Sequence, residues 1–139
     1  MNAAPSRASA PAPVSVLVVE GSTVLRDRLL WLVAEVDGVS TAAGAATPEQ
    51  GLGRIAAAPV DAILVDADVA TGPALAELGA LRRAAPDALL VVLASEPGPE
   101  LRERCAAMGA DECLSFSAEL PRLDELLRLL VASRAGGLR

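Results

Sequence analysis

Short apolar runs alternate with helix-type patterns along the chain. Five runs predict β-strands, at residues 14–19, 39–43, 60–66, 89–94 and 112–116. Apolar residues at helical spacing predict helices between these strands and after the last one, at residues 22–36, 47–58, 74–85, 100–108 and 123–131. Because the third and fourth runs are continuously apolar, the pattern favours a parallel sheet with helices on both faces.

Local signals mark the ends of two predicted helices. Ser22 stands where the N-cap of the first helix is expected, and Gly38 can close that helix with a left-handed residue. Residues 47–50, Thr-Pro-Glu-Gln, place a cap, a first-turn proline and a glutamine in the order of a capping box. These signals agree with the helices that the apolar spacing predicts.

The third apolar run ends abruptly in a carboxylate, Asp66, and Asp68 follows two residues later. A buried parallel strand carries such a residue to its carboxyl end, which is the edge where open α/β sheets place their chemistry. Asp66 is therefore the first candidate functional residue. The competing interpretation is a strand-end aspartate that only hydrogen-bonds loop amides.

The composition fits one folded domain that binds neither membranes nor nucleic acids. With 139 residues, 53% of them apolar, the chain can bury one substantial core. No apolar run approaches the roughly 20 residues of a membrane span, and the Ala/Pro/Ser-rich start lacks the features of a signal peptide. The net charge of −6 provides no basic surface for nucleic acid. We expect a cytoplasmic domain at 14–133, a flexible leader at 1–13 and a frayed tail at 134–139.

Three residue types with reactive side chains are absent. The chain has no His, no Tyr and no Lys, since all its basic residues are Arg. Histidine-based acid–base catalysis and Lys Schiff-base chemistry are therefore excluded within this chain, and a P-loop would lack its Lys. Cys105 and Cys113 show no metal-site spacing and are predicted to be reduced residues in or near the core. We expect no enzymatic activity.

Four segments together resemble, in order and spacing, the receiver domain of response regulators in two-component signalling: residues 16–22, 63–66, 91–95 and 109–113. The resemblance covers nearly all of the predicted domain. It implies a single doubly wound, five-stranded parallel sheet of the flavodoxin-like α/β class, with strand order 2-1-3-4-5 and helices on both faces. It also implies a site where the first, third, fourth and fifth strands end.

When the phosphorylation site of the receiver family is mapped onto this sequence one position at a time, only part of it is present. The resemblance places the phosphoacceptor on Asp66. The acidic pair that holds Mg²⁺ falls on Glu20 and Gly21, so one carboxylate is longer and the other is missing. The hydroxyl that contacts the phosphoryl group falls on Ala94, and the Lys falls on Phe116.

Further positions complete the comparison with receivers. Asp68 falls where the family gives a backbone carbonyl to the metal, so its side chain is expected to be exposed. Ser117 replaces the usual proline, and Cys113 replaces the aromatic switch residue. Phe116 is expected to pack into the space of the missing Lys. Ser95 is expected to point to the opposite side of its strand from the missing hydroxyl.

These departures weaken both metal binding and phosphoryl transfer. Mg²⁺ demands near-ideal octahedral oxygen geometry, and phosphoryl transfer needs charge stabilised across the transferred oxygens, which Ala94 and Phe116 cannot provide. We therefore expect inefficient phosphorylation and no required cofactor. Weak Mg²⁺ binding is the most that Glu20, Asp66 and the Asp68 carbonyl can give. The alternative to a metal-site role for Glu20 is that it is a solvated charge at the end of the strand.

Three functions follow from these residues. The leading hypothesis is a stand-alone atypical receiver, a pseudo-receiver that acts in signal transduction as a protein-interaction module. The alternative is a phosphoacceptor response regulator that receives phosphate on Asp66 from a histidine kinase. The third is small-molecule binding at the strand ends. The sequence has no Gly-x-Gly-x-x-Gly fingerprint after its first strand. With no Tyr and one Trp, it also offers few aromatic side chains to stack on a flavin ring.

The partners that the resemblance implies are a histidine kinase or a downstream effector. Receivers commonly dock or dimerise through the fourth helix, fifth strand and fifth helix. Here that face would carry mixed charges able to pair across a two-fold axis: Arg102, Arg104, Asp111, Arg122, Asp124 and Glu125. An ordinary solvated surface carries the same kind of charges, so a homodimer is one of two interpretations.

Overall fold

The computed structural model describes residues 13–67 and 75–136, so the predictions for 1–12, Asp68 and 137–139 lie outside it. Its elements are β1 (Val14–Val19), α2 (Thr23–Ala34), β2 (Val39–Ala45), α3 (Pro48–Ala57), β3 (Ala62–Asp66), α4 (Leu75–Ala84), β4 (Leu89–Ala94), α5 (Pro99–Ala107), β5 (Glu112–Ser115) and α6 (Leu120–Gly136). Strands and helices alternate as the apolar pattern predicts. None of the helices within the described ranges has the length and apolar character needed to cross a membrane.

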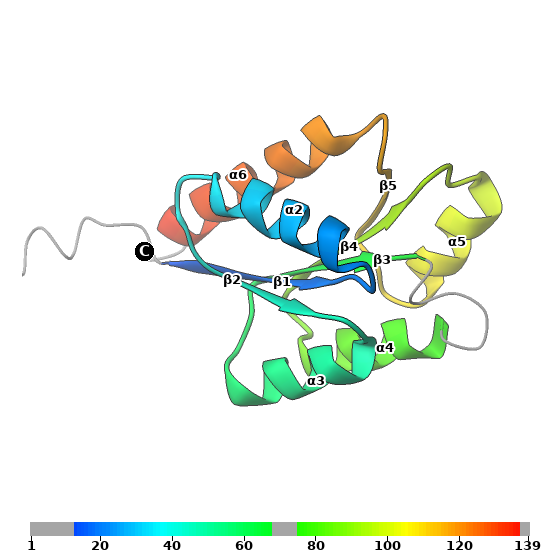
Figure 1. The fold of residues 1–139 in the computed structure, drawn as a ribbon, viewed down its shortest axis with the longest axis horizontal. Helices are drawn as coiled ribbons and strands as arrows, with labels where there is room; N and C mark the ends of the chain where they lie inside the picture. Colours follow the sequence, from blue (N-terminus) through cyan, green and yellow to red (C-terminus); the bar gives the residue numbers. More distant parts are fainter. Residues whose placement is uncertain (1–12, 68–74, 137–139) are drawn as a thin grey trace, which may run out of the picture.

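The five strands form one parallel sheet in the order β2-β1-β3-β4-β5. The predicted sheet type and strand order are therefore confirmed. Figure 1 shows α2 and α6 on one face of the sheet and α3 and α4 on the other. Cys105 of α5 belongs to the same core layer as Leu78 of α4, so α5 covers the second face as well. Each pair of consecutive strands is joined through a helix, as parallel strands require.

Alternation along the central strands divides the core into two layers. In β1, Leu17 packs into the layer under α3 and α4, whereas Val18 packs into the layer under α2 and α6. Val65 and Leu64 of β3 divide in the same way. Both faces of these strands are buried, which explains their continuously apolar sequences. The rigid central strands end together and fix the positions of the residues that follow them.

The predicted helix caps are present, with one change. Ser22 Oγ accepts the amide hydrogen of Leu25, and Thr47 Oγ1 accepts the amide hydrogen of Gln50, as N-caps do. In a capping box the Gln50 side chain would bond the amide of Thr47 itself. Its Oε1 instead accepts the amide hydrogen of Ala46, one residue earlier, at 2.9 Å. The cap therefore ties α3 to the end of β2.

Some element boundaries differ from the sequence pattern. β2 extends to Ala45, beyond the predicted end at 43, because Ala45 still pairs with Val19 of β1. β3 begins at Ala62 instead of 60. Gly38 has a φ of 99°, so it closes the turn after α2 in the left-handed conformation that the sequence predicts.

The last helix corrects the predicted tail. α6 continues to Gly136, so residues 134–136 are helical and the expectation of fraying from 134 is wrong for them. Arg134 Nη2 lies 2.7 Å from Asp61 Oδ1 in an ion pair, and Asp61 Oδ2 accepts the amide hydrogen of Ser15 at 2.9 Å. This contact ties the end of α6 to the sheet. Helical periodicity cannot encode such a long-range pair.

Candidate functional site

A cavity of about 370 Å³ surrounds the phosphoacceptor candidate at the carboxyl ends of three strands. Asp66 ends β3, Ala94 ends β4, and Phe116 directly follows β5. The cavity is lined by Leu25, Asp66, Ala94, Ser95, Glu96, Phe116 and Ser117. The structure therefore brings three of the predicted site positions together. This convergence follows from the parallel sheet, whose strands all end at the same edge.

Glu20 is a buried residue that is bonded to the start of α2. Its side chain is 3% exposed, and Oε2 accepts the amide hydrogen of Ser22 at 2.9 Å. Its backbone carbonyl accepts a hydrogen bond from Arg26 Nη1 at 2.8 Å. The interpretation of Glu20 as a solvated charge is therefore wrong. Neither Glu20 nor the exposed Gly21 belongs to the lining of the cavity at Asp66.

The described side chains offer few ligands for a magnesium ion. Mg²⁺ needs near-octahedral oxygen ligands at about 2.0–2.1 Å, but Gly21 has no side-chain oxygen, and a backbone amide already binds one oxygen of Glu20. Across residues 13–67 and 75–136, no three Asp, Glu, Cys or His side chains are placed to hold one metal ion. Asp68, whose carbonyl the receiver resemblance implies as a ligand, lies outside those ranges.

Ser95 directly follows β4 and lines the cavity together with Asp66. Ala94 is buried at the end of β4, as expected of a residue that replaces the hydroxyl. The sequence predicts that the Ser95 side chain points to the opposite side of the strand, and the residue itself contributes to the cavity lining. The strand ends at Ala94, so side-chain alternation no longer governs the next residue. Ser117 also lines the cavity, and the sequence comparison noted it only as a replacement for proline.

Phe116 occupies the position where receivers carry their Lys. Its side chain is half-buried and packs against the core layer under α2 and α6, and its amide donates to the carbonyl of Ala94 at 2.7 Å. Both contacts support the expected packing role. The ring also lines the cavity beside Asp66, so an apolar surface replaces a positive charge there.

The charges around the cavity have one sign. Among the described residues that line it, the ionisable side chains are Asp66 and Glu96. A phosphoryl group in transfer carries negative charge on its oxygens and needs cationic or hydrogen-bonding groups aimed at them. The hydroxyls of Ser95 and Ser117 can donate hydrogen bonds, but they cannot neutralise charge. The lining is therefore poorly suited to phosphoryl transfer.

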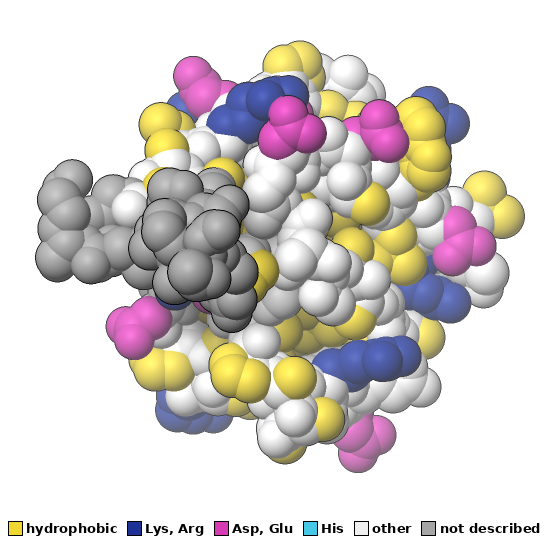
Figure 2. All heavy atoms as spheres, turned by 90° about the vertical axis from the view of Figure 1, so that its left-hand side faces the viewer, with side chains coloured by type: hydrophobic (Ala, Val, Ile, Leu, Met, Phe, Trp, Pro, Cys, Tyr) yellow, Lys and Arg dark blue, Asp and Glu magenta, His cyan; other side chains and the backbone are white. Residues whose placement is uncertain are grey.

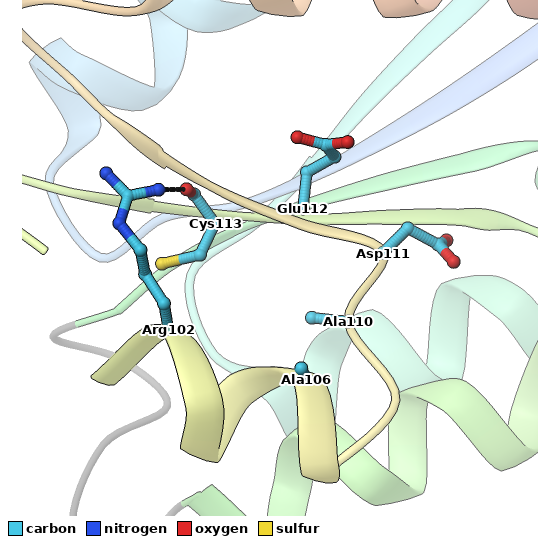
Figure 3. A pocket seen from close by; sticks show the side chains of 6 residues that line it. All are labelled: Arg102, Ala106, Ala110, Asp111, Glu112 and Cys113. Carbon is cyan, nitrogen blue, oxygen red and sulfur yellow. Dashed lines mark hydrogen bonds between the residues drawn. The ribbon is translucent and has the colours of Figure 1, made fainter. Parts of the chain in front are cut away.

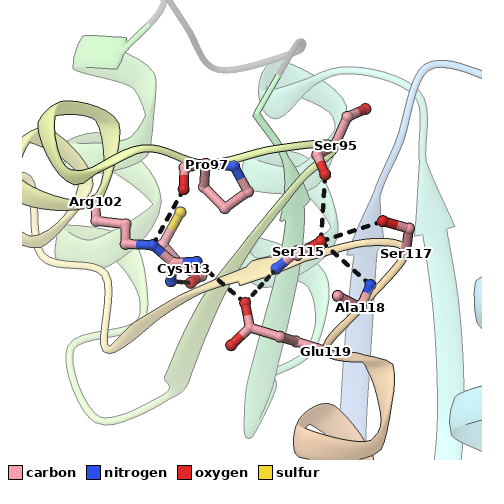
Figure 4. Close-up of polar contacts among 8 residues, drawn as sticks. All are labelled: Ser95, Pro97, Arg102, Cys113, Ser115, Ser117, Ala118 and Glu119. Carbon is pink, nitrogen blue, oxygen red and sulfur yellow. Dashed lines mark hydrogen bonds and ion pairs between the residues drawn. The ribbon is translucent and has the colours of Figure 1, made fainter.

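A clasp of hydrogen bonds fixes the end of β5 against α5 and the start of α6 (Figure 4). Arg102 of α5 donates to the backbone carbonyls of Cys113 and Pro97, and its Nη2 lies 3.1 Å from Glu119 Oε1. The same Glu119 oxygen accepts the amide hydrogen of Ser115 at 2.8 Å. We call Arg102, Glu119 and their partners the Arg102 clasp. Sequence periodicity gives no signal for it.

The hydroxyl of Ser115 extends the Arg102 clasp toward the cavity. It donates to the carbonyl of Ser95 at 3.2 Å and accepts the amide hydrogen of Ala118 at 3.2 Å. Its oxygen also lies 3.4 Å from the hydroxyl oxygen of Ser117. The ends of β4 and β5 are thereby joined next to Asp66. The site and the α5–β5–α6 surface share one bonded network.

Acid should loosen the Arg102 clasp. The amide of Ser115, followed by Arg102, holds the pKa of Glu119 below its ordinary value of 4.5. A lowered pKa means that the carboxylate stabilises the fold above pH 4.5 and that this contribution is lost as the pH falls through the lowered pKa. The amide shift of Ser115 should therefore titrate with a midpoint below 4.5. Glu119→Gln should abolish this titration, whereas Glu103→Gln, next to Arg102 on α5, should keep it. A midpoint at or above 4.5 would contradict the clasp.

The charges of the α5–β5–α6 face are largely paired within the chain. Ion pairs join Arg82 to Asp111, Arg102 to Glu119, Arg122 to Glu112 and Glu125, and Arg128 to Asp124. Most of the charges that a homodimer was expected to pair across a two-fold axis therefore have partners already. Exposed pairs of this kind typically contribute 0 to about 1 kcal/mol each. The pattern favours the interpretation of a solvated surface.

Comparisons with known proteins identify the fold. Neither a protein-family model nor a curated protein matches the sequence. Among solved structures, the receiver domain of a DNA-binding response regulator from Colwellia psychrerythraea is 15% identical with a TM-score of 0.76, covering 86% of this chain and 98% of that one. The chemotaxis protein CheY4 of Vibrio cholerae is 23% identical with a TM-score of 0.72, covering 86% and 99%.

A third match comes from a complex. A chain in the structure of the CheA3 P1 domain bound to CheY6 from R. sphaeroides is 23% identical with a TM-score of 0.70, and the match covers 87% of this chain and 98% of that one. These matches span nearly the full length of the solved chains. Together with the sheet order, they show that this chain has the flavodoxin-like fold of response-regulator receiver domains.

Proposed function

We propose that this chain is an atypical, cytoplasmic receiver domain that acts in signal transduction by binding other proteins, without the usual switch at the aspartate. One observation carries the proposal. The cavity around Asp66 has Ala94 and Phe116 where a receiver needs a hydroxyl and a cation, and its ionisable lining residues are acidic. The acceptor remains, but the groups that would stabilise a transferred phosphoryl group do not. The proposed function, binding to other proteins, then depends on the surface of the domain.

The two replacements are costly for phosphoryl transfer. Removing one donor that stabilises charge in a transition state typically costs about 2.7–4 kcal/mol. If the two contacts act independently, their joint loss lowers the rate by about 10⁴- to 10⁶-fold. The missing Lys would have made a charge-assisted bond, which is stronger than a neutral one. Phosphorylation of Asp66 is then too slow to serve as a switch.

The proposed module requires no cofactor and catalyses no reaction. Glu20 and Asp66 permit weak Mg²⁺ binding at most, because one oxygen of Glu20 already accepts a backbone hydrogen bond. The chain also lacks His and Lys. The ionisable residues in the described lining of the cavity, Asp66 and Glu96, are both acidic, so this lining supplies no basic group for acid–base catalysis.

Treatment with acetyl phosphate and Mg²⁺ tests the proposal. We expect the intact mass of the full chain to stay unchanged, because Ala94 and Phe116 stand where a receiver has its hydroxyl and its cation. A mass increase of one phosphoryl group, near one per chain and abolished by Asp66→Asn, would overturn the proposal. Ser95→Ala is the matched control, because it removes a cavity hydroxyl without touching the acceptor.

The alternative is a slow phosphoacceptor driven by a cognate kinase. Two observations support it: Asp66 keeps its place at the end of β3 within the cavity, and one structural match comes from a complex that contains the P1 domain of CheA3. It predicts transfer from the phosphorylated histidine kinases encoded beside this chain, and none to Asp66→Asn. A kinase that binds without transferring phosphate would favour the interaction module.

The proposed partners are a histidine kinase or a downstream effector, bound through the α5–β5–α6 face. A homodimer through this face would have to exchange internal ion pairs such as Arg122–Glu125 for intermolecular ones. We therefore expect a monomer in sedimentation at both low and high salt. A dimer at low salt that dissociates at high salt would show instead that these charges pair between chains.

A further inference from the structure

The two cysteines of the chain lie against each other beneath the α5–β5–α6 face. Cys105 is on α5 and is 1% exposed, and Cys113 is on β5 and is 8% exposed. Both are free thiols and belong to the same core layer. Each thiol affects the pKa of the other, so the two side chains are close neighbours. Neither residue lines the cavity at Asp66, so the proposed function does not use them.

A second cavity gives a small molecule a path to Cys113. It has a volume of about 160 Å³ and is lined by Arg102, Ala106, Ala110, Asp111, Glu112 and Cys113. Figure 3 shows the short side chains of Ala106 and Ala110 at its border, with Cys113 beside Arg102. A water molecule occupies about 30 Å³ in the liquid. The cavity therefore has room for a molecule such as hydrogen peroxide next to Cys113.

We propose that Cys105 and Cys113 are a redox modification site, at which a peroxide closes a reversible disulfide between α5 and β5. The two thiols are neighbours in one core layer, so the second sulfur reacts within the molecule once the first has been oxidised. Such intramolecular steps proceed at very high effective concentration. The site lies outside the Asp66 cavity and provides a switch that is independent of phosphorylation.

The reaction balances in two steps. The sulfur of Cys113 attacks one peroxide oxygen, the O–O bond breaks, and a sulfenic acid and one water form. The sulfur of Cys105 then attacks the sulfenic sulfur, the S–O bond breaks, and a disulfide and a second water form. The two thiols lose two electrons and two protons in total, and hydrogen peroxide takes up both. A dithiol reductant reverses the change.

The surroundings make this site slow to oxidise. Burial, reinforced by the neighbouring Cys105, raises the pKa of Cys113 to about 11, and burial also raises the pKa of Cys105. Since the thiolate is the reactive form, only about one Cys113 in 10⁴ is reactive at pH 7. The proposed switch therefore responds to sustained oxidation, and its rate should rise about tenfold per pH unit below the pKa of Cys113.

Disulfide closure would act directly on the docking face. A disulfide holds its sulfurs about 2.05 Å apart, which is closer than two hydrogen-bonded thiols can approach. Cys113 also gives its backbone carbonyl to Arg102, and Arg102 holds Glu119 at the start of α6. Drawing β5 toward α5 therefore shifts the Arg102 clasp. Oxidation would change the shape of the surface that the proposed partners bind.

Peroxide treatment of the full chain tests the site. After denaturation and alkylation, the oxidised chain should carry no alkylated cysteine, its mass should fall by two hydrogens, and peptide mapping should join residues 105 and 113. Dithiothreitol should restore both thiols. The amide shifts of Arg102 and Glu119 should change with the same time course.

Single variants make the test specific. Cys105→Ala should leave Cys113 as a sulfenic acid that dimedone traps, and Cys113→Ala should react far more slowly because the remaining thiol is the more buried one. Peptide mapping of the native chain needs no variant, so it stands even if a variant folds poorly. The proposal is overturned if the native chain keeps both thiols at peroxide doses that modify Cys105→Ala. It is also overturned if oxidation gives sulfenic acid or intermolecular dimers without the 105–113 link.

Discussion

A variant that carries Gly21→Asp, Ala94→Thr and Phe116→Lys together should accept a phosphoryl group from acetyl phosphate on Asp66 at least 10³-fold faster than the native chain. The change returns a hydroxyl and a cation to two positions that line the cavity, and a metal carboxylate to position 21, two residues after the end of β1. Two transition-state contacts alone correspond to about 10⁴- to 10⁶-fold. The expected gain of 10³-fold is set below this range because the new side chains need not reach the ideal geometry of a receiver site.

The backbone can accept these changes. Among the described glycines, positive φ values occur at Gly38 and Gly109 and not at Gly21, so Asp at position 21 meets no left-handed strain. Phe116 is half-buried at a strand end, where a Lys can extend toward the cavity. Mass spectrometry and phosphate release would give the rates. Adding Asp66→Asn to the triple variant should return the rate to the background.

The single variants separate the contributions. Phe116→Lys should give the largest single gain, because it supplies the missing charge. Ala94→Thr alone should give less, since two serines, Ser95 and Ser117, already line the cavity. If the native chain reacts as fast as the triple variant, the replaced residues are not what limits phosphorylation. If the folded triple variant stays unreactive, the buried Glu20 becomes the next position to restore as Asp.

Arg82→Ala should lower the free energy of unfolding by about 2–4 kcal/mol, the largest loss we expect from a surface-reaching side chain. The Arg82 side chain is only 20% exposed. Its guanidinium donates to the carbonyls of Ala85, Pro86, Ala88 and Gly109 and to Asp111 Oδ2. Removing it leaves partly buried carbonyls without their donor, and unmade hydrogen bonds of that kind are costly.

The neighbouring Arg83 is the matched control for Arg82. It is exposed on the same turn of α4, so Arg83→Ala should change stability by no more than about 0.5 kcal/mol. Arg82→Lys should recover only part of the loss, because a single ammonium cannot reproduce the planar fork of a guanidinium. Urea denaturation should give the largest loss of unfolding free energy for Arg82→Ala, a smaller loss for Arg82→Lys and the smallest for Arg83→Ala. Equal losses for Arg82→Ala and Arg83→Ala would show that the hydrogen bonds of Arg82 contribute little.

Much of the fold and part of the site follow from the sequence. Continuous apolar runs predict the buried parallel strands, and the receiver resemblance predicts their order. Because parallel strands end at one edge, Asp66, Ala94 and Phe116 were expected to meet, and they line one cavity. The burial of Glu20 was not predicted, because the bond from the Ser22 amide depends on how the loop turns into α2.

The contacts that sequence patterns miss are made by side chains that reach across elements. Arg102 joins α5 to β5 and α6, and Arg82 joins α4 to the loops before β4 and β5. Hydrophobic periodicity reports which face of a helix is buried, but not which distant carbonyl an Arg reaches. The direction of the Ser95 side chain is beyond the pattern for a related reason, since alternation holds only within a strand and β4 ends at Ala94.

Titration of the full chain with Mg²⁺ and beryllofluoride, followed by amide chemical shifts, tests the central claim most directly. Beryllofluoride stands in for a phosphoryl group on an aspartate and needs the same oxygen-binding contacts. We predict that the amides of Asp66, Ala94 and Phe116 do not shift, because the described lining of the cavity offers no cation to those oxygens. Saturable shifts at these three residues, lost in Asp66→Asn, would contradict the claim that the phosphorylation site is degraded.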